Sequence, residues 1–198
     1  SRAKNIGFLI VREKYPDDYK NITLVFNDVD TMPFSKNFIL YQTDHGRVKH
    51  FYGFKFTLGG IVSITGQDFE KINGFPNFWA WGYEDNMLND RVKNMNMIID
   101  RSTFFPFADK NILHFYDGYL KQVNKQEFER YERGTREGIN SLFKVKYSVN
   151  KETGLIDITS FETGTDENKR LTHMHDLHNG TRPFVGRRRG TRGMSFFL

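Results

Sequence analysis

Two adjacent acids, Glu84 and Asp85, stand directly behind an aromatic and glycine-containing stretch. The apolar residues after them have helical spacing: Met87, Leu88 and Val92. The acids therefore fall in the first turn of an expected helix, where the helix dipole favours negative charge, and helix capping is one interpretation. The other is chemical, because flat apolar side chains beside carboxylates suit sugar binding and raise the basicity of an acid. The aromatic residues concerned are Phe78, Trp79 and Trp81.

A second pair of acids, Asp28 and Asp30, follows the apolar run 22–26. Such a run is typical of a strand buried on both faces, and ligands of open α/β sheets bind beyond the carboxyl ends of strands. Strand alternation would point both side chains to one side, with Cα atoms about 7 Å apart, so both could reach one ion or nucleotide. A solvated turn is the alternative.

Two further features carry a chemical and a structural interpretation each. The paired glycines Gly59 and Gly60 would let the backbone approach a ligand closely, or would form a β-bulge. His114 could be a metal ligand, although a single histidine is more often structural.

Together these segments resemble the signature of the β-1,4-galactosyltransferase family. The resemblance rests on the Gly-Gly turn at 59–60, Asn-Gly-Phe-Pro-Asn at 73–77 and Trp-Gly-Tyr-Glu-Asp at 81–85. Arg-Ala-Lys at 2–4 and Gly-Ile-Asn-Ser-Leu at 138–142 also match, so it covers roughly residues 1–160. It implies an α/β fold of the GT-A-like nucleotide-diphospho-sugar transferase type with a mixed sheet.

The family places further strands before the Arg-Ala-Lys helix, and this sequence lacks them. We therefore expect residues 1–160 to form a catalytic domain truncated at its amino end, as a fragment of a larger protein rather than a reduced gene. Residues 161–198 would be an extension with an Arg-rich, flexible end.

The resemblance implies a metal site. By that match Asp30 and His114 ligate a divalent ion on the donor diphosphate, and Asp28 lies beside the sugar of the nucleotide. Asn111 stands where the family has a methionine ligand. The implied cofactor is Mn2+. Because an amide oxygen is harder than a thioether, we expect Mg2+ to be tolerated as well.

The resemblance also implies roles in binding and catalysis. Asp85 becomes the base that takes the acceptor proton, and Glu84 holds sugar hydroxyls. A free aspartate has a pKa near 3.9, so burial and the neighbouring acid would have to raise it. Phe128 is a candidate for acceptor stacking, with ordinary helix packing as the alternative. The residues matched to the donor or its nucleotide are Arg2, Asp28, Thr57, Gly59, Gly60 and Trp81.

Thr57 replaces an aromatic residue that touches the donor sugar in the family, which would leave room for a different substituent. We therefore expect an inverting, metal-dependent transfer of a hexose, galactose or N-acetylgalactosamine-like, from a UDP-sugar to a carbohydrate or glycoconjugate hydroxyl. One rival is a non-catalytic sugar- or nucleotide-binding relic. Another is a binder of anionic polymers through the basic end.

Composition limits these alternatives. The 198 residues suit one domain, and of 29 Lys and Arg residues five are arginines that follow the last acid, Asp176. The remaining 24 equal the 24 acids, which argues against nucleic acid as a partner of the body. His173, His175 and His178 could bind a metal, but a solvated segment is the simpler interpretation.

The sequence has no cysteine, no signal peptide and no apolar run of about 20 residues. On these grounds we expect no membrane segment, and the cytoplasm is favoured over the Golgi lumen.

The pattern of apolar residues predicts the elements that carry the candidate side chains. Helices are expected near the start of the chain and over 85–94. The lid of the family corresponds to 118–128. Strands are expected over 22–26, 48–56 and 95–99, and a hairpin over 144–149 and 155–158.

Overall fold

The computed structural model describes residues 1–165, 171–179 and 183 of the chain. Its helices are α1 (Arg2–Lys14), α2 (Gly66–Lys71), α3 (Glu84–Asn94), α4 (Lys125–Glu132), η1 (Ile139–Ser141) and η3 (Leu177–Asn179). Its strands are β1 (Thr23–Asn27), β2 (Thr31–Pro33), β3 (Arg47–Tyr52), β4 (Ile61–Thr65), β5 (Ile98–Asp100), β6 (Ile112–His114), β7 (Leu120–Asn124), β8 (Phe143–Val149), β9 (Ile156–Glu162) and β10 (Thr172–Asp176).

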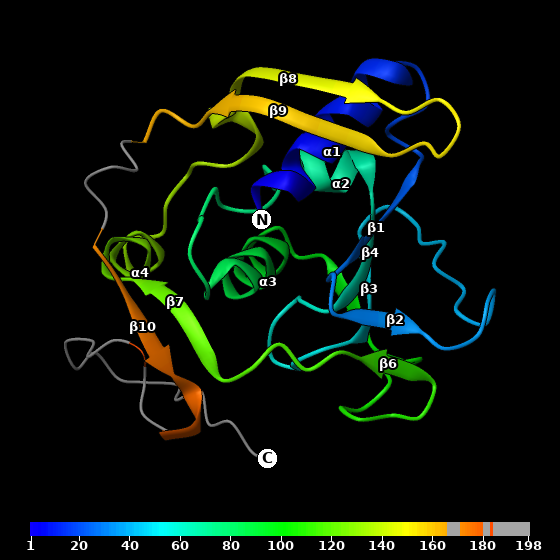
Figure 1. Ribbon diagram of the computed structural model, residues 1–198. Coiled ribbons are helices and arrows are strands. Elements are labelled where there is room, and N and C mark those ends of the chain that lie inside the picture. Colours follow the sequence, from blue (N-terminus) through cyan, green and yellow to red (C-terminus); the bar gives the residue numbers. More distant parts are fainter. Residues whose placement is uncertain (166–170, 180–182, 184–198) are drawn as a thin grey trace.

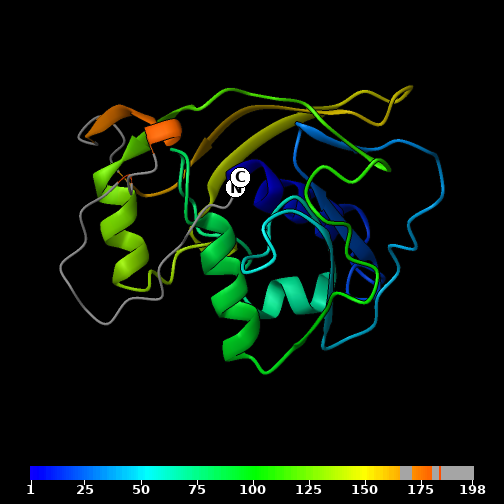
Figure 2. The same cartoon turned by 90° about the horizontal axis from the view of Figure 1, so that it is seen from below.

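The main sheet has the strand order β1-β4-β3-β5. Strands β1 and β3 both pair with β4 in antiparallel fashion, whereas β3 and β5 are parallel, so the sheet is mixed as expected. Helix α3 lies between this sheet and α4 in Figures 1 and 2.

The expectation that the run 22–26 is buried on both faces is wrong. Strand β1 is an edge strand of the sheet, and its side chains alternate, with Leu24 and Phe26 buried and Val25 41% exposed. The strand buried on both faces is β4, which the sequence analysis did not single out, because Ser63 interrupts its apolar pattern. The Ser63 hydroxyl is satisfied inside the core by donating to Tyr41 O at 2.6 Å.

Helix α1 is buried on two sides, which explains the apolar pattern of the first residues. Phe8 packs into the main core together with residues of the sheet, α2 and α3, while Ile6 and Ile10 pack under β8 and β9. The hairpin of β8 and β9 is confirmed, and Figure 1 shows it lying across α1.

Two short strand pairs lie beside the main sheet. Strands β2 and β6 pair with Thr31 opposite His114, and β7 pairs with β10, about 50 residues later in the chain. Strand β9 continues to Glu162, past the expected boundary at residue 160, and β10 falls within the expected extension. The Arg-rich end from residue 184 lies outside the described residues.

Two expected strands differ in their bounds, for reasons of local geometry. The strand expected over 48–56 ends at Tyr52, where Gly53 takes a positive φ of 123°. The strand expected over 95–99 begins only at Ile98, because Asn96, with φ of 55°, turns the chain out of α3.

The Asn-Gly-Phe-Pro-Asn segment ties distant parts of the chain together. Asn5 on α1 donates to Phe75 O at 2.8 Å and to Asn77 Oδ1 at 2.9 Å. Asn77 in turn donates to Gly138 O at 2.8 Å and to Ser141 Oγ at 3.0 Å, beside η1. Asn5 and Asn77 are both fully buried, and we call this arrangement the asparagine clasp.

No helix in the described part of the chain is long and apolar enough to cross a membrane.

Candidate active site

Asp85 lies in the first turn of α3 with its carboxylate against the Gly-Gly turn. A Cβ atom on Gly59 would come within 2.0 Å of Asp85 Oδ2, so only glycine leaves space for this side chain. The backbone is fixed as well, because Leu58 N donates to Asp85 O at 3.2 Å. Tyr83 precedes the two acids with φ of 68°, a left-handed conformation that a bulky residue rarely adopts.

The surroundings of Asp85 give its carboxyl a strongly raised pKa, about 8. Burial is the largest cause, and the neighbouring Glu84 carboxylate adds to it, while the ammonium of Lys4 opposes it. A general base requires such a raised pKa, because a free aspartate is too weak a base. Glu84 itself has one buried oxygen, Oε2, without a hydrogen-bond partner among the described residues.

Asp28 lies on the α1 side of this site. Lys4 Nζ donates to Asp28 Oδ1 at 2.6 Å, and Gly60 N donates to Asp28 Oδ2 at 2.9 Å. Burial lowers the pKa of Lys4, but Asp28 and Asp85 outweigh burial and leave that pKa raised. Lys4 therefore stays protonated, paired with Asp28 and stabilised by the charge of Asp85.

Asp30 has different partners from Asp28. The chain turns after β1, with Thr31 N donating to Asp28 O at 3.1 Å, so strand alternation does not apply to this pair. Asp30 Oδ2 lies 3.6 Å from His114 Nε2 across the β2–β6 pair, and Phe115 N donates to Asp30 O at 2.7 Å. The structure thus brings together the two residues that the sequence analysis matched to metal ligands.

The Asp30–His114 pair fits a divalent cation. Two ligand atoms at right angles about such an ion, each about 2.1–2.5 Å away, would lie about 3.0–3.5 Å apart, close to the observed separation. Carboxylate oxygen and imidazole nitrogen are ligands that Mn2+ and Mg2+ accept to different degrees. No group of three or more His, Asp or Glu side chains among the described residues is placed to hold a metal, so phosphate oxygens and waters would complete such a site.

Asn111, the third residue matched to a metal ligand, is held by another acid. Its side-chain nitrogen donates to Asp109 Oδ1 at 3.0 Å, and its backbone nitrogen donates to the same oxygen at 2.8 Å. Its role in metal binding stays a prediction.

The Gly-Gly turn lies against an irregular part of the main sheet, and its role at a ligand stays a prediction. The β3–β4 register shifts between His50 and Tyr52, as at a β-bulge. A Cβ on Gly60, whose φ is 72°, would lie 2.3 Å from Tyr52 O. In the structure the two glycines allow close contacts within the chain: Gly59 with Asp85, and Gly60 with Tyr52.

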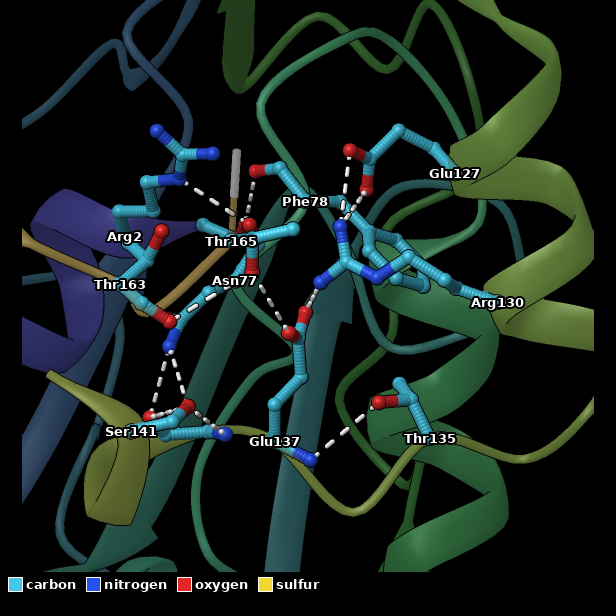
Figure 3. A network of polar contacts seen from close by, with 12 residues as sticks. Arg2, Asn77, Phe78, Glu127, Arg130, Thr135, Glu137, Ser141, Thr163 and Thr165 are labelled. Atoms are coloured by element: carbon cyan, nitrogen blue, oxygen red, sulfur yellow. Dashed lines mark hydrogen bonds and ion pairs between the residues drawn. The ribbon is translucent and has the colours of Figure 1, made fainter. Parts of the chain in front are cut away.

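The aromatic surface expected beside the acids is smaller than predicted. Phe78 is only 2% exposed, because the Arg130 guanidinium covers its ring at 5.0 Å from the centroid. Figure 3 shows Arg130 beside Phe78 and between two carboxylates, Glu127 on α4 and Glu137 after it. Phe78 therefore anchors α4 and is not free to bind a sugar.

Trp79 and Trp81, which precede the acids in the chain, are half-buried, and Trp81 N donates to Gln122 O of β7 at 2.9 Å. Phe128 on α4 is also half-buried, with its ring 5.1 Å from that of Tyr83. This contact places Phe128 next to the helix that carries the acids, and its acceptor role stays a prediction.

The remaining candidates have partners of their own. Arg2 Nε donates to Asn77 O at 3.0 Å, at the start of α1. Thr57 is buried, with its hydroxyl donating to Phe54 O at 3.2 Å and its carbonyl accepting from Arg101. Neither arrangement tests the donor roles that the resemblance implied.

The sequence analysis missed two residues that the structure places in the site. Lys4 donates to Asp28 and interacts electrostatically with Asp85, and its place in the matched Arg-Ala-Lys segment was a signal that could have found it. Tyr52 contacts His114, and no sequence pattern distinguishes it from a core tyrosine.

A family model described as the N-terminal domain of galactosyltransferase matches residues 45–117, which include the Gly-Gly turn, both acids of α3 and His114. Mouse β-1,4-galactosyltransferase 5 is 31% identical over 155 residues, which are 74% of this chain and 39% of that protein. The chain belongs to the β-1,4-galactosyltransferase family.

The fold agrees with this membership. The catalytic domain of Drosophila β-1,4-galactosyltransferase 7, in a complex with xylobiose, superposes with a TM-score of 0.61 at 19% identity, covering 85% of this chain and 76% of that one. A mutant of the same enzyme in complex with manganese, UDP-Gal and xylobiose gives a TM-score of 0.62 at 20% identity over the same shares. The GT-A-like fold expected from the sequence is thereby confirmed.

This galactosyltransferase-family chain spans about two fifths of the length of the curated relatives that it matches. The preference for the cytoplasm is wrong, because those relatives are β-1,4-galactosyltransferases, which are Golgi enzymes. Neither a lack of cysteine nor a lack of an apolar run in this chain outweighs that finding.

Proposed function

We propose that this family member is an inverting glycosyltransferase that moves a hexose from a UDP-sugar to a hydroxyl of a carbohydrate acceptor. The observation that carries the proposal is the carboxylate of Asp85, which has a raised pKa and is packed against Gly59, one residue before the glycine that binds Asp28. Residues 1–160 would supply this catalytic unit.

Asp85 would act as the general base. The acceptor hydroxyl gives its proton to the Asp85 carboxylate while its oxygen forms a bond to the anomeric carbon. The bond between that carbon and the diphosphate oxygen breaks on the opposite face, and its electron pair leaves with the nucleotide. The anomeric configuration is therefore inverted. A positioned base of this kind contributes about 10²–10⁴-fold to the rate.

Glu84 would bind a sugar hydroxyl. Its buried Oε2 has no partner among the described residues, and a buried acceptor without a hydrogen bond costs about 1–3 kcal/mol. A hydroxyl of acceptor or donor would satisfy this oxygen and fix the sugar next to Asp85.

Asp30 and His114 would hold a divalent cation, Mn2+ or Mg2+, with oxygens of the diphosphate. Bound there, such an ion supplies positive charge that stabilises the departing diphosphate. Lys4, fixed by Asp28, keeps a further positive charge on the α1 side of the site. The ligands in the related Drosophila complex, manganese, UDP-Gal and xylobiose, support this choice of partners.

The test combines donor binding with turnover. UDP and a panel of UDP-hexoses are titrated calorimetrically into the chain with and without Mn2+, and sugar transfer is assayed with the donors that bind. We expect metal-dependent binding that Asp30→Asn abolishes, and turnover that Asp85→Asn lowers by at least about 100-fold while donor binding survives.

Asp90→Asn is the matched control, because Asp90 is an exposed residue of the same helix and should leave both measurements unchanged. Donor binding without turnover for any acceptor would favour a sugar- or nucleotide-binding relic. Donor binding that Asp30→Asn leaves unchanged, with turnover unchanged in Asp85→Asn, would refute the proposed site.

A further inference from the structure

Tyr52, at the end of β3, contacts His114 of the candidate metal site. Its hydroxyl lies 2.9 Å from Nδ1 of His114, the ring nitrogen that faces away from Asp30. Tyr52 is only 1% exposed, and its ring lies nearly parallel to that of Phe107 with centroids 6.2 Å apart. The tyrosine is therefore a fixed part of the interior.

The backbone at Tyr52 is held in place by three independent features. The β-bulge between His50 and Tyr52 changes the direction of the side chain relative to a regular strand. The ring of His50 contacts the carbonyls of Tyr52 and Gly59, each 3.0 Å from its Nε2. Gly60 packs so closely on the Tyr52 carbonyl that no other residue fits.

His50 is suited to this task because it is neutral. Burial, together with the charge of the neighbouring Arg101, lowers its pKa to about 4. With Arg101 Nε donating to His50 Nδ1 at 3.0 Å, the single proton of the ring lies on Nε2 and points at the two carbonyls.

The two ring nitrogens of His114 face different partners: Nδ1 faces the Tyr52 hydroxyl, and Nε2 faces Asp30. A histidine that binds a metal through Nε2 must present a lone pair there, so Nδ1 carries the proton and needs an oxygen to accept it. The Tyr52 hydroxyl is the oxygen at that position. The 3.6 Å between Nε2 and Asp30 Oδ2 is longer than an N–H···O hydrogen bond and leaves space for an ion between them.

We propose that Tyr52 is the positioning residue of the metal site: its hydroxyl fixes the ring of His114 so that Nε2 faces the cation held with Asp30. This inference rests on the proposed function, since it takes Asp30 and His114 as the cation ligands. Tyr52 does not touch substrate or cation and acts only through His114.

Tyr52→Phe tests the inference, because it removes one oxygen and keeps the ring that packs on Phe107. Tyr41→Phe is the matched control: Tyr41 belongs to the same apolar cluster, and its ring contacts Phe51 at 5.5 Å. Mn2+ binding is measured without nucleotide by the paramagnetic resonance signal of free Mn2+. We expect a 10–100-fold weaker Mn2+ affinity for Tyr52→Phe and less than a twofold change for Tyr41→Phe.

Nitrogen-15 spectra of the histidine rings give a second readout that a purely structural role would not change. In wild-type chain loaded with diamagnetic Mg2+, the proton should lie on Nδ1 of His114 and exchange slowly with water, and in Tyr52→Phe it should exchange fast. Equal Mn2+ affinity of wild type and Tyr52→Phe would overturn the inference and leave the proposed function standing. Wild type that binds Mn2+ neither alone nor together with UDP would overturn both.

Discussion

Adding one methyl group at Gly59 should displace the proposed base without unfolding the protein. The Cβ of Gly59→Ala would lie 2.0 Å from Asp85 Oδ2 and 2.5 Å from its Cγ, whereas real Cβ contacts stay beyond 3.0 Å. The carboxylate must therefore retreat by about 1 Å. A misplacement of about 1 Å costs about 100-fold in rate, which corresponds to about 2.7 kcal/mol of transition-state stabilisation.

The assay separates this effect from loss of folding or of donor binding. Transfer rates, the Kd of the UDP-sugar and the melting temperature are measured for wild type, Gly59→Ala and Gly7→Ala. Gly7 in α1 has no atom within 4 Å of an added Cβ, so its substitution adds the same group without a clash. Because Gly59 does not have a left-handed φ, alanine should not strain the backbone there.

We expect kcat to fall about 100-fold in Gly59→Ala, with the Kd of the donor and the melting temperature nearly unchanged. Gly7→Ala should leave all three quantities unchanged, apart from a gain in stability of up to about 1 kcal/mol. A kcat for Gly59→Ala within threefold of wild type would refute the assignment of Asp85 as a base held in this position.

Three further results are expected. Because burial and the neighbouring Glu84 raise the pKa of Asp85 to about 8, kcat/KM should increase with pH as this carboxyl loses its proton. A kcat/KM that has already reached its plateau by pH 5 would contradict the raised pKa. Arg130→Met removes the cation that pairs with the buried carboxylate of Glu127, so the free energy of unfolding in urea should fall by about 3–5 kcal/mol. The exposed Arg133→Met should lower it by less than about 1 kcal/mol. If Asn111 contributes an amide oxygen, Mg2+ should support donor binding and activity in place of Mn2+. Activity with Mn2+ but not with Mg2+ would exclude Asn111 as a ligand of this kind.

Residue patterns were sufficient to predict the elements that carry the chemistry. The apolar spacing after Glu84 located α3, and the run before Asp28 located β1. The β8–β9 hairpin followed from its two alternating segments. These features are local, so the sequence near each one determines it.

Contacts between distant segments could not be predicted in the same way. The exposure of Val25 depends on β1 lying at the edge of the sheet, which the strand order sets and the strand itself does not. Phe78 looked like a ligand-binding aromatic because the guanidinium that covers it belongs to a helix some 50 residues later. Tyr52 is directed to His114 by a bulge whose partner strand lies beyond the Gly-Gly turn.

The asparagine clasp has a consequence for the order of folding. Its hydrogen bonds join residues 61 to 72 positions apart, from α1 through Asn77 to η1. Each such contact forms only after a long segment of chain has lost its freedom, so the clasp contributes to a high contact order and a slow folding step. Conservative changes such as Asn77→Asp should therefore slow refolding as well as weaken the native state, and a ribosome would have to release Ser141 before the signature segment could take its final form.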